Sequence, residues 1–401
     1  MFILILYGLL LINSGAMNNT DPKDDAFCFP VLNRQDQCDK CHNANVVEAT
    51  VAQYSRSRHF RGRTFRRART NECAPCHTHE GFMDVVKNNT SVEFIGDPSN
   101  PSMFRNSYVA SDSSLVYPGP ISCFTCHSSI HTRHTPDEFY PLSSTRPVPM
   151  TMWGGSKTIS FRRDFSNLCA KCHQPRPVLN TSGKYIDYSK LSVKKAEVFN
   201  DATVSYGTGV HYSTQAAIFS GTGAVEFGSG YKNSAHTSKA SCTDCHMGEF
   251  SGSAGGHTFT AQGNFKVCNK PECHSSRNES DPELKKAVNN IKSGLRVLGE
   301  KLDRIAEPGI LRKDTATGAF TGYPDIFDPQ SNPSGKYRSP FISGWSEDNL
   351  KHNSSLPPFP QLSNAQFGAF LNFQMVLRDG SYGVHNYDYT RKLLKRSAAS
   401  F

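Results

Sequence analysis

Five short sequences of the same kind divide the first two thirds of the chain. In each, two cysteines are separated by two residues, and a histidine follows the second cysteine directly. With 13 Cys and 15 His among 401 residues, chance would supply only about 0.02 copies of this pattern. The five copies contain Cys38, Cys41 and His42; Cys73, Cys76 and His77; Cys123, Cys126 and His127; Cys169, Cys172 and His173; and Cys242, Cys245 and His246.

This pattern is typical of covalent haem attachment. Two thiols add to the two vinyl groups along one edge of a porphyrin, the two intervening residues span that edge, and the adjacent histidine ligates the iron. Zinc or iron–sulfur binding is the alternative, but zinc ribbons use paired cysteines without a fixed following histidine. The sequence therefore predicts five c-type haems, each with its motif histidine as the proximal axial ligand.

A sixth site is less regular. Cys268 and Cys273 are separated by four residues and are followed by His274. A longer loop can bulge and still present both sulfurs, so we predict a sixth covalent haem here; a disulfide or an unmodified cysteine pair is the alternative. Twelve of the 13 cysteines are then used in pairs, and no role is predicted for Cys28, which is left over.

The remaining histidines are numerous enough to give every iron a second axial ligand. Six irons with two imidazoles each need six histidines beyond those of the attachment sequences. Nine such residues exist: His59, His79, His131, His134, His211, His236, His257, His352 and His385.

The composition agrees with a core built partly from cofactors. Only 37% of the residues are hydrophobic, yet 26 Phe and 15 Tyr argue against a disordered chain. The formal charge of +9 describes the polypeptide alone; because each haem adds two propionates, we expect the basic residues to balance them rather than bind nucleic acid. We predict a mainly α fold with extensive irregular loops wrapped around a packed haem chain, little β structure and a long C-terminal helix.

Three segments follow from these patterns. Residues 1–16 resemble an export signal, with an apolar run from Met1 to Ile12 and small residues at 14–16; an uncleaved anchor or a mis-assigned start codon is the alternative. Residues 17–280 form the multihaem domain, and its Ser- and Pro-rich stretches, such as 97–120, predict loops. Residues 281–401 form a helical region that closes over the haem core. We expect a periplasmic or extracellular location.

One long helix is predicted after the last haem site. Asp281 suits the N-cap and Pro282 the first position. A heptad stripe of apolar residues then runs from Leu284 to Ile305 and ends before Pro308. We expect this stripe to pack either against another helix of the same chain, at residues 363–378, or against a second copy in a dimer.

Several segments outside the attachment sequences carry a family resemblance. The stretch from Tyr206 to Gln215 is similar to a GPHHGPQ segment, and the stretch from Arg378 through His385 to Leu394 looks like a GxHNxxY…LL ending. Shorter similarities surround His131, His173-Gln174, His236 and His257. Together these segments resemble a multihaem cytochrome family related to ammonia-forming cytochrome c nitrite reductase and to octahaem reductases.

The resemblance implies a set of distal ligands, one for each of six haems. These are His59, His131, His211, His236, His257 and His385, which leaves His79, His134 and His352 without an axial role. Two departures weigh against nitrite reduction. The chain contains no Cys-x-x-Cys-Lys sequence to mark a catalytic haem, and the family's double histidine is His211-Tyr212 here.

Three functions are compatible with these patterns. Irons with two imidazoles are coordinatively saturated, which favours electron transfer between redox protein partners. A reductase of nitrite, hydroxylamine or a sulfur oxyanion would need one iron with an open site. A subunit of an extracellular filament or an outer-membrane conduit is the third function. A homo-oligomer, as dimer or filament, is compatible with the sequence, and any membrane contact is expected through partners. We favour electron transfer and assign no catalytic residue.

Overall fold

The computed structural model describes a discontinuous set of residues: 43–62, 65, 74–88, 94–97, 100–106, 119–128, 142–176, 178, 186–201, 210–305 and 361–400. The predicted export signal, the whole first attachment sequence, Cys28, Cys73, His131, His134 and His352 lie outside them. The chain divides into two units, Met1–Gln53 and Tyr54–Phe401. Every histidine whose contacts are given below belongs to the second unit.

Short helices dominate the described residues, which confirms the mainly α prediction. They are α3 (Ala44–Tyr54), α4 (Arg58–Arg61), α5 (Ala74–His77), α6 (His79–Asn88), α7 (Cys123–Cys126), α8 (Ser166–Ala170), α9 (Tyr188–Val193), α10 (Gln215–Ser220), α11 (Ala235–Lys239) and α12 (Cys242–His246), with the 3-10 turns η2 (Thr151–Trp153), η3 (Gly256–Thr258) and η4 (Phe265–Val267). None of the helices in the described ranges combines the length and apolar character needed to span a bilayer.

Strands in the described residues form two small antiparallel sheets. β1 (Phe94–Asp97) pairs with β2 (Asn100–Asn106), and β3 (Val148–Pro149) pairs with β4 (Thr158–Ile159). The loop prediction for 97–120 was therefore wrong over β2. Backbone pairing with β1 stabilises this segment, although its Asn, Pro and Ser content gave no alternation of apolar and polar residues from which a strand could be predicted.

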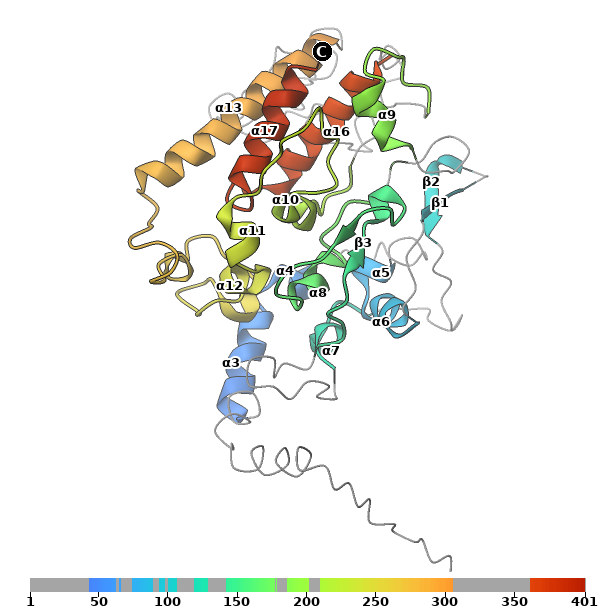
Figure 1. Ribbon diagram of the computed structural model, residues 1–401. Coiled ribbons are helices and arrows are strands. Elements are labelled where there is room, and N and C mark those ends of the chain that lie inside the picture. Colours follow the sequence, from blue (N-terminus) through green and yellow to red (C-terminus); the bar gives the residue numbers. More distant parts are fainter. Residues whose placement is uncertain are drawn as a thin grey trace, which may run out of the picture. The chain divides into compact units, whose positions relative to one another are not determined.

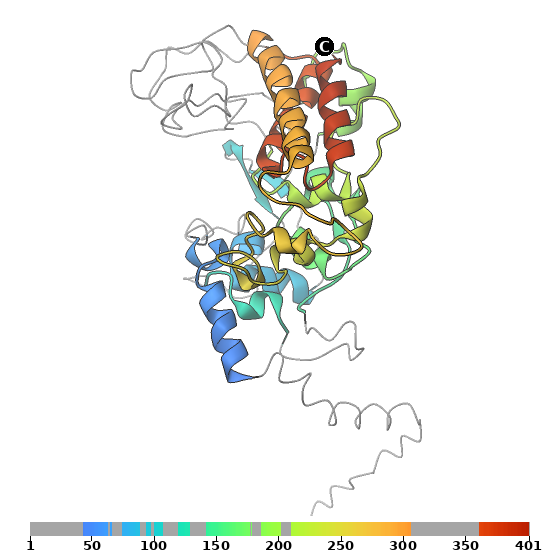
Figure 2. The same cartoon turned by 90° about the vertical axis from the view of Figure 1, so that its left-hand side faces the viewer.

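Three longer helices pack together near the C-terminus (Figures 1 and 2): α13 (Pro282–Ile305), α16 (Asn364–Asp379) and α17 (Tyr387–Ala398). The α13 helix begins where predicted, because Oδ1 of Asp281 accepts hydrogen bonds from the backbone N–H groups of Glu283 and Leu284, at 2.8 and 3.2 Å. Its stripe is buried within the chain, with Ile291 and Leu295 fully enclosed. The stripe packs on α17 as well as on the α16 segment that the sequence indicated.

The α16 helix is buried along most of its length and anchors irregular loops. Oδ1 of Asn372 accepts from the backbone N–H of Val225 at 2.9 Å, and its Nδ2 donates to the carbonyl of Val225 at 2.7 Å and to Ser397 Oγ at 2.9 Å. Oε1 of Gln374 accepts from the backbone N–H of Val210 at 2.8 Å. Buried backbone groups need partners, and here helix side chains supply them in place of a sheet ladder.

Candidate functional site

Helical turns carry all or part of four predicted attachment sequences. Both cysteines of two sequences lie within one turn, Cys123 and Cys126 in α7 and Cys242 and Cys245 in α12, whereas Cys76 and His77 end α5, and α8 holds Cys169 but ends before Cys172. Residues three apart share one face of a helix. In α7 and α12 one turn therefore presents both sulfurs of a motif on one side, with the motif histidine directly after the second sulfur. This is the local geometry that attachment to one porphyrin edge requires.

The fifth regular sequence shows how its own intervening residues form this turn. In α12, Ser241 Oγ accepts from the backbone N–H of Asp244 at 3.2 Å, and Asp244 Oδ2 accepts from the backbone N–H of Ser241 at 2.8 Å. This reciprocal capping box starts the helix at Cys242. Asp244 also receives two hydrogen bonds from Arg163, at 2.7 and 2.8 Å. The residue between the two cysteines thus fixes the turn in place.

Each described motif histidine lies opposite one other histidine at nearly the same distance. The ring centres are 5.9 to 6.2 Å apart in all five cases, although the angle between the ring planes varies. The pairs are His59–His173 at 6.1 Å and 84°, His77–His211 at 6.1 Å and 80°, His127–His257 at 6.2 Å and 35°, His246–His385 at 6.2 Å and 43°, and His236–His274 at 5.9 Å and 86°.

Every pair combines one motif histidine with one of the histidines that the family resemblance implies as distal. The ring of His79, which has no axial role in that scheme, lies instead with its Nδ1 2.9 Å from Thr125 Oγ1. The remaining motif histidine, His42, and the remaining distal candidate, His131, both lie outside the described residues. The structure thus brings each of five motif histidines next to one of the distal candidates, including His274 of the irregular site.

Burial lowers the pKa of several paired rings and so favours their neutral form. Burial, reinforced by His173 and His246, lowers the pKa of His59 to about 4. Burial also lowers the pKa of His211 to about 3, with contributions from Arg176 and His77. A neutral imidazole has a free lone pair, which is the form that binds a metal.

The Nδ1 atoms of several paired rings have partners that orient the ring. Nδ1 of His246 lies 2.9 Å from the carbonyl of Phe259, and Nδ1 of His236 lies 2.6 Å from the carbonyl of Val384. Because these contacts occupy Nδ1, the Nε2 atom is left to face the opposite ring. Sequence reasoning missed these partners, since a backbone carbonyl carries no residue-specific signal.

One ring has a charged partner that sequence reasoning also missed. Nδ1 of His385 lies 2.6 Å from Oδ1 of Asp379, whose side chain is 1% exposed. Burial lowers the pKa of His385, but the charge and hydrogen bond of Asp379, aided by Cys242, raise it overall. Asp379 stands only six residues before His385, so its proximity was visible in the sequence, although its orientation was not.

Cysteines from different attachment sequences lie next to one another. The thiols of Cys76 and Cys172 are close enough to shift one another's pKa, and so are those of Cys169 and Cys242. The backbone N–H of Cys242 also donates to Ser166 Oγ at 3.2 Å, which links α12 to α8. The described cysteines are all free of disulfides, and no cluster of three or more metal-binding side chains occurs among the described residues. Three attachment sequences are therefore brought into one neighbourhood.

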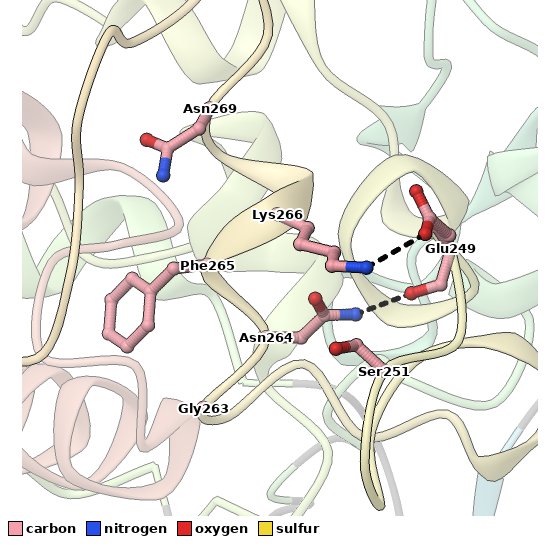
Figure 3. A pocket seen from close by; sticks show the side chains of 7 residues that line it. All are labelled: Glu249, Ser251, Gly263, Asn264, Phe265, Lys266 and Asn269. Atoms are coloured by element: carbon pink, nitrogen blue, oxygen red, sulfur yellow. Dashed lines mark hydrogen bonds and ion pairs between the residues drawn. The ribbon is translucent and has the colours of Figure 1, made fainter.

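A surface pocket of about 530 Å³ is lined by residues between Glu249 and Asn269 (Figure 3). Lys266 Nζ is 3.0 Å from Glu249 Oε1, and Asn264 Nδ2 donates to the carbonyl of Glu249 at 2.8 Å. The residues that line it include neither histidine nor cysteine. The pocket is thus not part of the paired-histidine arrangement.

Comparisons with known proteins add little to this geometry. No protein-family model matches the chain, and no curated protein matches it. Among solved structures, the chain is similar to the outer cell wall cytochrome OcwA, with 16% sequence identity and a TM-score of 0.42. The similarity covers 88% of this chain and 50% of OcwA, so the chain spans about half the length of that protein.

Proposed function

We propose that the chain transfers electrons through about six covalently attached c-type haems, with most of the irons held between two histidines. The spacing of the histidine pairs carries this proposal. A metal–imidazole bond is about 2 Å long and the ring centre lies about 1.1 Å behind the nitrogen, so two imidazoles on opposite sides of one iron have ring centres about 6.2 Å apart. The five observed spacings, 5.9 to 6.2 Å, agree with that value.

The arrangement of residues fits haem c in a second, independent respect. Two motif histidines, His127 and His246, follow cysteine pairs that a single helical turn presents on one face. Such a turn would hold the porphyrin edge while the histidine ligates iron from one side and its partner ligates it from the other. When bound, the haem iron supplies a reversible one-electron change, which the protein tunes through its axial ligands and their hydrogen bonds.

Double imidazole ligation favours electron transfer over substrate reduction. A six-coordinate iron offers no free position to nitrite, hydroxylamine or a sulfur oxyanion. The five pairs account for every motif histidine in the described residues. We therefore infer that this chain shares the haem arrangement of nitrite and octahaem reductases but does not reduce their substrates.

The thiol contacts support a continuous path for the electron. Cys76 with Cys172, and Cys169 with Cys242, would bring the edges of three porphyrins close together. The haem of His173 would then lie beside those of His77 and His246. Burial and the nearby Cys268 raise the pKa of Cys245 to about 11, so the path would continue toward the haem of His274. Redox proteins outside the cytoplasm are the proposed partners, since covalent haem attachment accompanies the predicted export signal.

Haem content and spin state test the proposal together. The full chain is produced with cytochrome c maturation machinery, and its intact mass should increase by one haem for each attachment sequence. The oxidised protein should show low-spin ferric spectra and should be reduced and reoxidised without consuming nitrite or hydroxylamine. A double variant with Cys123→Ala and Cys126→Ala should lose the mass of one haem. A purified chain with the mass of its amino acids alone and no Soret absorbance would overturn the proposal.

A further inference from the structure

The carboxylate of Asp379 is held in a fixed position against one ring of a histidine pair. Helix α16 ends at Asp379, and Gly380, with φ of +71°, turns the chain sharply there. Oδ2 of Asp379 accepts hydrogen bonds from Ser381, from its hydroxyl at 2.5 Å and its backbone N–H at 3.3 Å. Its other oxygen, Oδ1, lies 2.6 Å from Nδ1 of His385. Both oxygens are thus engaged, and the side chain is 1% exposed.

We propose that Asp379 is a positioning residue that lowers the reduction potential of the haem held by His246 and His385. This inference rests on the proposed function, because it requires that these two rings share an iron. It goes beyond that function by assigning one buried carboxylate a role in setting the energy of one electron-transfer site.

Two physical effects act in the same direction. A carboxylate that accepts the N–H of a ligating imidazole makes that imidazole a stronger electron donor, which favours the ferric iron. A buried negative charge near the haem also opposes the arrival of an electron, because the low dielectric of the interior screens it weakly. The step itself is the gain of one electron by ferric iron. No bond forms or breaks, and the proton stays between Asp379 and His385.

Neutral groups occupy the same position on His246, His236 and His173, whereas the Nε of Arg277 donates to Nδ1 of His274 at 3.3 Å, so the carboxylate beside His385 is a distinguishing feature. Nδ1 of His246 and of His236 contact the backbone carbonyls already described. Nδ1 of His173 lies 3.3 Å from Oε1 of Gln215, an uncharged amide. A carbonyl or amide accepts a weaker hydrogen bond than a carboxylate does. The neighbouring haem of His173 would therefore differ in potential from the haem of His246.

The test is a spectroelectrochemical redox titration of the haem-loaded full chain, with mediators supplying the electrons. Asp379→Asn keeps the shape of the side chain and removes its charge. The reduction potential of one haem should rise by at least 59 mV, which corresponds to a tenfold change in its one-electron equilibrium constant. Glu226→Gln is the matched control: it makes the same charge change next to the C-terminal helical region, at a residue whose carboxylate accepts from the Tyr389 hydroxyl rather than from a paired ring. It should leave all components in place.

Two further variants separate the possible failures. His385→Ala should convert one haem to high spin, which identifies the component; no spectral change would refute the proposed ligation itself. Ser381→Ala retains the charge of Asp379 and removes the hydroxyl that donates to its Oδ2. The reduction potential of the same haem should therefore fall. This variant tests the proposal if Asp379→Asn does not fold. A high-spin haem in His385→Ala, together with unmoved potentials in the Asp379 and Ser381 variants, would overturn the tuning role alone.

Discussion

Removal of His59 should convert one six-coordinate haem into a five-coordinate haem. The ring of His59 lies 6.1 Å from that of His173, whereas Cys169, Cys172 and His173 are supplied by another part of the chain. In His59→Ala the haem should therefore stay attached and keep its proximal ligand. If all six attachment sequences are filled, about one sixth of the low-spin ferric signal should be replaced by a high-spin signal.

The position that the substitution opens should be able to bind small ligands. Phe259 stacks edge-on against His59, with ring centres 4.7 Å apart, and would form an apolar wall of the vacated space. Added imidazole should enter this space and restore the low-spin spectrum. The assay is EPR and optical spectroscopy of the oxidised protein, before and after imidazole, with intact mass to confirm that no haem is lost.

His79→Ala provides the matched control. Its ring contacts Thr125 rather than another histidine, so the substitution should leave the spin state of every haem unchanged. The reasoning would be refuted by a fully low-spin His59→Ala protein, or by a high-spin signal of equal size in His79→Ala.

The remaining predictions concern the ring planes, the irregular site and the core. Perpendicular axial imidazoles leave two iron d orbitals nearly equal in energy, so the haems of His173, His77 and His274 should give EPR signals with a large maximal g value, and those of His127 and His246 rhombic signals. A single class of signal would contradict the observed angles. Cys268→Ala with Cys273→Ala should remove the mass of one haem, whereas Cys28→Ala should remove none; equal masses would mean that the irregular site carries no haem. Asn372→Ala leaves both backbone groups of Val225 without their buried partner, which should cost about 3 kcal/mol of unfolding free energy. Chemical denaturation should show this loss, whereas Asn290→Ala, at an exposed asparagine, should be nearly neutral; equal losses would refute the assigned role.

The sequence predicted what depends on local spacing. Two cysteines three residues apart and a histidine beside the second define one helical turn and its chemistry, so the attachment sequences were visible without the fold. Helix α13 was similarly predictable, because Asp281, Pro282 and the heptad stripe each act on neighbouring residues. Its partner was only partly predictable. Contact with α17 depends on the close approach of Gly294 to Leu394, whose Cδ1 would lie 3.0 Å from a Cβ at that glycine.

The pairing of histidines depends on the tertiary fold and was out of reach. His59 and His173, or His77 and His211, come from segments far apart in the chain, and no spacing rule connects them. The family resemblance implied which histidines are distal, yet not which iron each one faces. The role of Asp379 could not be predicted from the sequence for a related reason. Its orientation toward His385 depends on the left-handed turn at Gly380, so the short distance between them in the sequence carried no distinguishing signal.

An experimental structure of the haem-loaded protein, by crystallography or cryo-electron microscopy, tests the central claim most directly. We expect an iron midway between His59 and His173, and one between the rings of each of the other four described pairs, with a porphyrin joined to the neighbouring cysteines. Irons held by different pairs of residues, or by a single histidine with an open position opposite, would contradict this account.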